Sequence, residues 1–183
     1  EQIVDLLQEA GEDDLVLCLI SGGGSALMTL PVEGVTLAEM QELTDALLRR
    51  GATINEINTI RKHLDRLKGG NLARLAHPAQ VISLILSDVV GNPLDVIASG
   101  PTVPDTSTYV DAWNLLERYG LVDDAPESIV AHMRRGVEGE IGDTPKAGDP
   151  IFENTQNVVV ASNDIAAAAA ERAARELGYH TLV

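Results

Sequence analysis

Residues Leu15 to Leu27 (LVLCLISGGGSAL) place six apolar residues directly before three glycines that lie between two serines. An apolar run rich in Leu, Val and Ile predicts a strand buried on both faces of a parallel sheet. Glycines let the backbone turn tightly and approach a ligand. Loops after such strands gather free N–H groups that bind anions. The stretch therefore predicts a buried strand ending in an anion-binding loop; a glycine-rich turn without a ligand is the alternative.

Two further apolar runs end in serine in the same way. Residues 81–86 lead into Ser87 and residues 158–161 lead into Ser162, with helical patterns between the runs. Alternating strands and helices predict an α/β fold, here a three-layer α/β/α Rossmann-like domain with a mostly parallel sheet. Because parallel strands end at one edge, where open α/β sheets bind ligands, we expect these loops to form one site.

The segments between the strands have the apolar spacing of amphipathic helices. Thr36 and Glu39 have the spacing of a capping box, and Asn163 or Asp164 is expected to cap the last helix. The expected helices cover residues 1–10, 37–50, 55–67, 71–76, 109–119, 126–136 and 163–177, and a fourth strand is expected at 179–183. Residues 137–157 are polar and rich in Gly and Pro, which predicts a surface segment without chemistry.

Composition limits the class of protein and its partners. The chain has 183 residues, of which 45% are hydrophobic, enough for one globular domain. Its 28 acidic and 13 basic residues give a net charge of −15, which argues against nucleic acid or an anionic membrane as partner. An acidic surface with few lysines suits a high-salt cytoplasm, and an ordinary acidic mesophilic enzyme is the alternative.

Cys18 is the single cysteine, so no internal disulfide can form and a buried, reduced thiol is expected. No apolar run is long enough to span a membrane, and the acidic start does not resemble a signal peptide. We therefore expect a cytoplasmic protein, with homo-oligomerisation left open. The chain begins without Met within a helical pattern, so we expect it to be part of a longer protein.

Three common site templates do not match. Leu27 stands where a dinucleotide fingerprint needs Gly or Ala, and the same residue replaces the final glycine of a hydrolase nucleophile elbow. Lys68 lacks the flanking residues of a P-loop. The four histidines are scattered and form no zinc pattern with one cysteine.

A basic stretch stands out in this acidic chain: Arg61, Lys62, Arg66, Lys68 and Arg74 fall within 14 positions. Arg61 and Lys68 are two helical turns apart and would share a face if the helix continued that far. Lys68 precedes two glycines, where backbone and side chain together suit a phosphate or carboxylate. A solvated basic helix face is the alternative.

Two acidic residues follow the second strand. Asp88 stands at the carboxyl end of that strand, a position typical of metal-binding or catalytic carboxylates. Asp105 ends the motif at residues 99–105, where capping of a turn is the favoured interpretation. The connection at 87–108 is long, and such connections are usually functional.

Four motifs, taken together, resemble the glycerate 2-kinases of the MOFRL type, and specifically their amino-terminal, DUF4147-like domain. They are SGGGSAL at 21–27, RKHL with KGG at 61–70, LSDVVG at 86–91 and SGPTVPD at 99–105. The resemblance also includes residues 51–58 and 162–163, so it covers nearly the whole chain.

The resemblance implies ATP-dependent phosphorylation of D-glycerate to 2-phosphoglycerate with Mg²⁺ or a similar cation. It also implies two α/β domains with the active site in the cleft between them. Residues 1–183 then form a single α/β domain, most of the larger amino-terminal one, with the second domain absent. This chain alone is expected to be an incomplete enzyme. The family usually has Asp where this chain has Asn92, which shifts cation binding onto Asp88.

The expected site has catalytic and ligand-binding members. Arg61 and Lys68 are expected to neutralise charge on the transferred group, and Asp88 to bind the cation. The residues expected to bind substrate or phosphate are Ser21, Gly22, Gly23, Gly24, Ser25, Gly69, Gly70, Ser99, Gly100, Thr102 and Asn163. Whether the loop at 21–25 holds nucleotide or glycerate is open. A hydroxypyruvate reductase and a non-catalytic nucleotide- or anion-binding domain are the alternatives.

Overall fold

The computed structural model describes residues 1–182, and within them the sheet has three parallel strands in the order β1-β2-β3. The strands are β1 (Leu15–Ile20), β2 (Gln80–Ser87) and β3 (Thr155–Ser162). Each apolar run identified in the sequence is therefore a strand. The α/β class and the parallel sheet are confirmed.

Helices fill the connections between the strands. They are α1 (Gln2–Gln8), α2 (Gly24–Leu27), α3 (Leu37–Arg49), α4 (Ile54–His63), α5 (Asn71–Ala76), η1 (Ile97–Ser99), α6 (Tyr109–Arg118), α7 (Glu127–Val137), η2 (Pro150–Phe152) and α8 (Asn163–Glu176). The capping box of Thr36 and Glu39 is present at the start of α3. The hydroxyl of Ser162 caps α8, so the expectation of Asn163 or Asp164 in that role is wrong.

Two boundaries differ from the sequence expectations. The helix expected to reach Leu67 ends at His63, because Asp65 turns the chain by accepting hydrogen bonds from the backbone N–H groups of Leu67 and Lys68. Arg61 and Lys68 therefore do not share a helical face. Residues 179–182 are not a strand, and Val183 lies outside the described residues.

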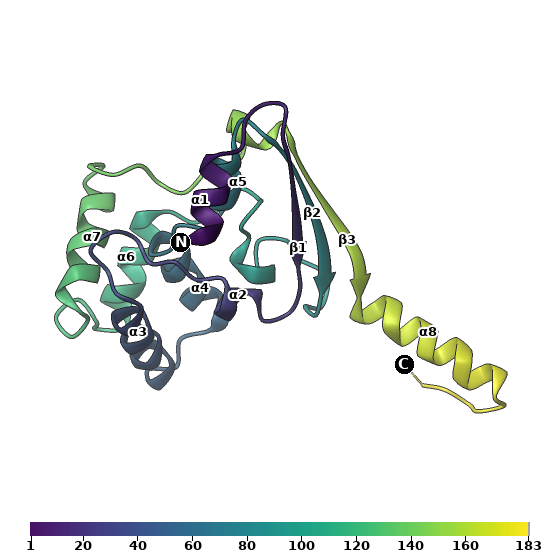
Figure 1. Cartoon of the computed structure of the whole chain (residues 1–183). Coiled ribbons are helices and arrows are strands. Elements are labelled where there is room, and N and C mark those ends of the chain that lie inside the picture. Colours follow the sequence, from purple (N-terminus) through teal and green to yellow (C-terminus); the bar gives the residue numbers. More distant parts are fainter. Residues whose placement is uncertain (183) are drawn as a thin grey trace.

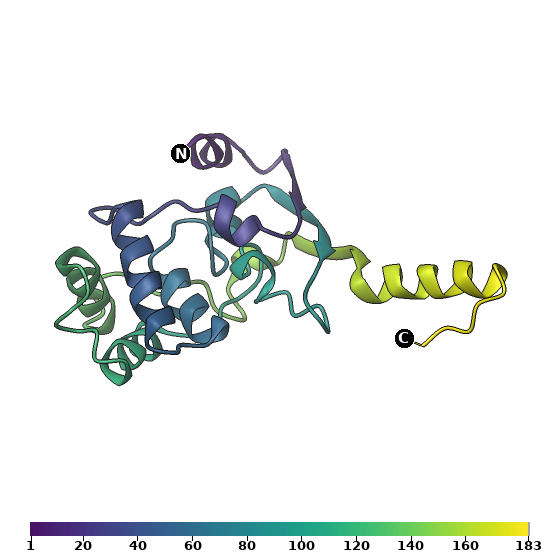
Figure 2. The ribbon, with the colours of Figure 1, turned by 90° about the horizontal axis from the view of Figure 1, so that it is seen from below.

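Among the described residues, apolar side chains gather in three clusters: one among the helices, one where α1 and α5 meet the sheet, and a small one around Ile20, Ile85, Ile97 and Ala98. Figure 1 shows the helices and strands that contribute to them. Helices α3, α4, α6 and α7 pack together around their own apolar core, and α1 and α5 pack beside the sheet. Figure 2 shows α8 projecting away from the other helices and the sheet, and α8 contains no buried residue. No helix in residues 1–182 has the length and apolar character that a membrane crossing requires.

The two faces of the sheet have different surroundings. Val81, Ser83 and Ile85 of β2 are buried on the face that the helices cover. On the opposite face Leu17 is 55% exposed and Leu19 is 76% exposed, so the expected burial of β1 on both faces is wrong for these residues. The third layer of the expected arrangement is not formed by residues 1–182. Cys18 faces the covered side, where burial raises the pKa of its thiol.

Gly136 provides a test of the helical core. A Cβ atom there would lie 2.3 Å from the ring of Tyr109. An alanine in a helix normally stabilises it relative to glycine, but here the overlap reverses the sign. We expect Gly136→Ala to lower the free energy of unfolding by about 1–3 kcal/mol in urea titrations. Gly142→Ala, where a Cβ meets nothing within 4 Å, is the control and should change it by less than about 0.5 kcal/mol.

Candidate functional site

The loops that follow the three strands meet at one edge of the sheet, as expected from their parallel direction. Ser87 at the end of β2 pairs in register with Ser162 at the end of β3. Beyond them, the side-chain amide of Asn163 donates a hydrogen bond of 2.9 Å to the backbone carbonyl of Asp88. This bond joins the loop that follows β2 to the start of α8, which follows β3.

The glycine loop after β1 lies directly against Asp88. A Cβ atom on Gly22 would lie 2.6 Å from a carboxylate oxygen of Asp88, so only glycine fits here with the carboxylate in this position. Asp88 is exposed and forms no ion pair with any residue in the described range 1–182. The structure therefore brings together the glycine loop, Asp88 and Asn163.

The connection after β2 contains strained backbone at the same place. Ala98, Ser99 and Gly100 have φ values of 51°, 62° and 60°, in the left-handed region. For a residue with a Cβ this conformation costs about 1–2 kcal/mol. Ala98 packs with Ile20 and other apolar residues beneath the strand ends. Strain held in a buried segment indicates a functional position.

The hydroxyl groups of Ser25 and Ser99 join this strained segment to the glycine loop. Their oxygens are 2.8 Å apart, and Ser99 also donates to the side-chain oxygen of Asn58 at 3.3 Å. Asn58 is buried in α4. Asn58 lies within the motif at 51–58, but the sequence does not distinguish it, because a polar residue inside a helix carries no signal of its own.

The glycine pair Gly69 and Gly70 holds the strained segment at 98–100 in place. The N–H of Gly69 donates to the carbonyl of Ser99 at 2.9 Å, and that of Gly70 to the carbonyl of Gly100 at 2.7 Å. Gly70 has a φ of 83°, and a Cβ on it would lie 2.9 Å from the carbonyl oxygen of Val103. These glycines are thus required by a close approach of two backbone segments.

Lys68 is completely buried, with 0% of its surface exposed. Its ammonium donates to the carboxylate of Asp65 at 2.8 Å, the hydroxyl of Thr29 at 2.9 Å and the carbonyl of Met28 at 2.5 Å. Burial lowers the pKa of Lys68, and the negative charge of Asp65 opposes that effect. Lys68 therefore fixes the segment that follows α2.

Two other expected site residues have different surroundings. Arg61 is partly buried and lines a pocket of about 190 Å³ with Ala26 and Thr29, just beyond the glycine loop. Thr102 is buried under the sheet, where it donates to Asn157 at 2.6 Å and accepts from Ser83 at 3.1 Å. Contact of Thr102 or Lys68 with a ligand stays a prediction.

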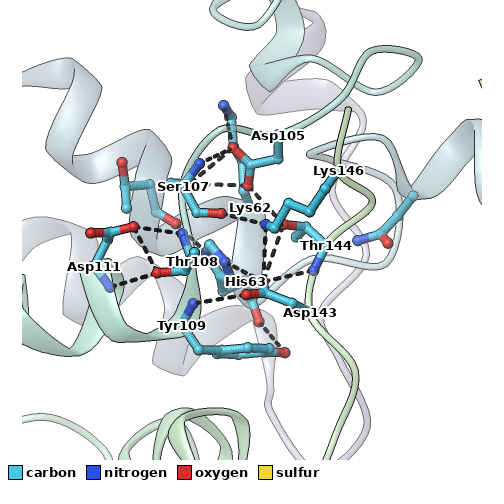
Figure 3. Close-up of polar contacts among 12 residues, drawn as sticks. Lys62, His63, Asp105, Ser107, Thr108, Tyr109, Asp111, Asp143, Thr144 and Lys146 are labelled. Atoms are coloured by element: carbon cyan, nitrogen blue, oxygen red, sulfur yellow. Dashed lines mark hydrogen bonds and ion pairs between the residues drawn. The ribbon is translucent and has the colours of Figure 1, made fainter. Parts of the chain in front are cut away.

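A network of hydrogen bonds and ion pairs joins three segments that lie far apart in the sequence, at residues 62–63, 105–111 and 143–146 (Figure 3). Asp105 is buried and accepts from the ammonium of Lys62 at 3.1 Å and from Ser107 and Thr144. Burial alone would raise the pKa of Asp105, but the charge of Lys62 and the hydrogen bonds from Ser107 outweigh it and lower the pKa. Thr144 lies in the segment that was expected to have no chemistry.

His63 and Asp143 form the other half of this network (Figure 3). The Nε2 atom of His63 is 3.0 Å from a carboxylate oxygen of Asp143, which also accepts from Lys146 at 3.2 Å. Desolvation raises the pKa of Asp143, but the interactions with His63 and Lys146 lower it by a larger amount. The pKa of Asp143 is therefore below its usual value. The prediction of a surface segment at residues 137–157 is wrong for Thr144, which is 5% exposed, whereas most of the segment lies at the surface.

A family model described as a domain of unknown function, DUF4147, matches residues 1–134, well over half of the chain. The chain belongs to the DUF4147 family. It is 49% identical over 183 residues to glycerate kinase of Rattus norvegicus, and 45% identical over 183 residues to glycerate 2-kinase of Pyrococcus horikoshii. All of this chain is aligned in both cases, but it spans only 34% and 41% of those relatives.

A solved structure agrees with these relatives. The crystal structure of glycerate kinase from Thermotoga maritima has a TM-score of 0.84 to this DUF4147 chain at 43% sequence identity. The match covers 98% of this chain and 40% of that protein. The arrangement of strands, helices and loops described above therefore also occurs in a glycerate kinase.

The Lys62–Asp105 pair should be structurally essential because both side chains are buried, at 7% and 0% exposure. Lys62→Met leaves the Asp105 carboxylate without its cation. We expect a loss of about 3–5 kcal/mol in the free energy of unfolding, measured in urea. Adding Asp105→Asn should recover most of it, and a double variant as unstable as the single one would contradict this account. As a control, Arg118→Met breaks an ion pair whose arginine is 65% exposed and should cost less than about 1 kcal/mol.

Proposed function

We propose that the full-length protein containing this chain uses ATP to phosphorylate D-glycerate on its 2-hydroxyl group. One observation carries the proposal: the glycine loop, Asp88 and the strained Ser99 meet at one sheet edge in a chain similar to glycerate kinases. Phosphoryl transfer asks a protein mainly to position the reactants and to stabilise charge. A loop that allows close approach, beside a carboxylate, is suited to both tasks.

Asp88 is the residue that would hold Mg²⁺. Residues 1–182 contain no group of three or more His, Cys, Asp or Glu side chains suited to a metal. Mg²⁺ in kinases is held by one or two carboxylates together with phosphate oxygens and water, so a single exposed carboxylate fits. Without a cation, the carboxylate of Asp88 would repel a phosphate group bound at the adjacent Gly22. A bound cation would neutralise that phosphate charge.

The remaining roles follow from position. We assign the backbone N–H groups of the loop at 21–25 to contact with an anionic group of nucleotide or glycerate, and Arg61, which lines the pocket beyond the loop, to charge neutralisation. Lys68 is assigned an indirect part through Thr29, which it holds in place. This chain would form most of the larger amino-terminal domain, and a second domain would close the cleft over this edge.

Neither alternative has support from a specific observation. A hydroxypyruvate reductase would need a nicotinamide site, and Leu27 occupies the position of the required small residue. A domain that binds anions or nucleotides without turnover would share the same geometry. A coupled assay of ADP release by the full-length protein with D-glycerate separates the three: only the kinase releases ADP in step with glycerate consumption. NADH oxidation with hydroxypyruvate would instead identify a reductase.

Asp88→Asn in the full-length protein tests the assigned carboxylate. We expect kcat to fall by about 10²–10³-fold, a typical loss when one group that stabilises transition-state charge is removed. Because Asp88 is exposed, the free energy of unfolding should change by less than about 0.5 kcal/mol. Asp13→Asn, an exposed carboxylate before β1 at the opposite edge, is the matched control and should retain full activity. Equal activity of the two variants would remove Asp88 from the site.

Lys68 requires a test that separates stability from chemistry. Lys68→Met leaves Asp65 buried and unpaired, so we expect a loss of about 3–5 kcal/mol in stability together with activity. The double variant Lys68→Met, Asp65→Asn should regain stability. If Lys68 acts by holding the segment after α2, part of the activity returns with it; a stable but wholly inactive double variant would instead place the ammonium on the ligand.

A further inference from the structure

Three side chains form a hydrogen-bonded row from the glycine loop into the core. The oxygens of Ser25 and Ser99 are 2.8 Å apart, and Ser99 donates to the Asn58 side-chain oxygen at 3.3 Å. Ser99 is completely buried and Asn58 is 6% exposed. Ser25 is half-buried and lies in the short helix α2, directly after the glycines at the sheet edge. The row thus connects a candidate ligand-facing hydroxyl to two fixed interior groups.

The number of protons determines the direction of these bonds. A serine hydroxyl has one proton to donate and two lone pairs to accept. The contact between Ser25 and Ser99 alone allows either hydroxyl to donate. Because Ser99 donates its proton to the Asn58 oxygen, it accepts from Ser25. The proton of Ser25 is therefore directed inward, and what remains on its oxygen is acceptor capacity.

Asn58 is positioned by α4, in which it is buried. Its amide oxygen accepts from the Ser99 hydroxyl at 3.3 Å. The backbone of Ser99 is also fixed, because its carbonyl accepts from the N–H of Gly69 at 2.9 Å.

A second set of contacts fixes the backbone of Ser25. The hydroxyl of Thr29 donates to the carbonyl of Ser25 at 3.2 Å, and Thr29 accepts from the buried ammonium of Lys68 at 2.9 Å. Ser25 is thus held through its main chain by Thr29 and through its side chain by Ser99. Its hydroxyl is a preorganised group rather than a free rotor.

We infer that Ser25 faces the ligand only as a hydrogen-bond acceptor, and so binds a hydroxyl group of the substrate rather than a phosphate or carboxylate oxygen. An anionic oxygen offers no proton to an acceptor and would be repelled by it. This assignment makes Ser25 a specificity residue for a hydroxy acid. It rests on the proposed function in naming D-glycerate as that acid.

Substrate analogues test the assignment in the full-length protein. D-lactate lacks the 3-hydroxyl group of D-glycerate and 3-hydroxypropanoate lacks the 2-hydroxyl group, while all three retain the carboxylate. Calorimetric Kd values should show the wild type binding D-glycerate about tenfold more tightly than one of the two analogues. In Ser25→Ala that preference should fall to near unity. A variant that weakens all three acids equally, or none, would overturn the inference. Ser128→Ala, whose hydroxyl contacts Glu39 on α3, is the control.

Variants of Asn58 test the row itself. Asn58→Asp can only accept and should preserve the preference for D-glycerate, whereas Asn58→Leu releases the proton of Ser99 and should reduce it. Loss of the preference in Asn58→Asp, with thermal unfolding unchanged, would contradict the direction of the bonds.

Neutron diffraction from deuterated crystals of the full-length protein tests the direction without any substrate. The deuterium of Ser25 should lie toward Ser99, and that of Ser99 toward Asn58. The reverse placement would overturn the inference even if ADP release confirms the kinase. Absence of ADP release with the expected deuterium positions would instead remove the proposed substrate and leave the acceptor role of Ser25 standing.

Discussion

The buried carboxylate of Asp65 is the group on which the site region depends. It accepts from the backbone N–H groups of Leu30, Leu67 and Lys68 and from the ammonium of Lys68. These bonds end α4, turn the chain toward Gly69 and Gly70, and fix Leu30 in the segment that follows α2. A buried carboxylate without such partners would be strongly destabilising, so these segments adopt this arrangement together.

Apolar runs and caps made most of the fold predictable. The three strands, the capping box of α3 and the meeting of the strand-end loops at one edge all follow from local patterns, because apolar strand runs and helix caps are made by residues close together in the sequence. The turn at Asp65 was not predictable, because the helical spacing continues through Leu67. What overrides it is the burial of Asp65, which pairs with Lys68 three residues along the chain and accepts from the distant N–H of Leu30. The exposure of Leu17 and Leu19 depends equally on what packs against β1, which the run of apolar residues does not reveal.

The candidate site was predictable as a set of motifs and not as a set of contacts. The sequence indicates glycines and a strand-end Asp88, but Gly22 is required by that carboxylate and Gly70 by the carbonyl of Val103. Lys68 precedes two glycines and is expected to neutralise ligand charge, and its ammonium is paired with Asp65 inside the protein. Lys62, in the same basic stretch, is paired with Asp105. Charge in a sequence does not indicate burial, because a buried partner can lie more than 40 positions away, as Asp105 does from Lys62.

The uncovered face of the sheet has a consequence for the behaviour of this chain in solution. Leu15, Leu17, Leu19, Leu86 and Val160 leave a band of apolar side chains open to water, and such bands associate with one another. The net charge of −15 opposes that association by repulsion between molecules. Salt screens the repulsion but leaves the apolar attraction intact. Added salt should therefore favour association of the separate chain through this uncovered face.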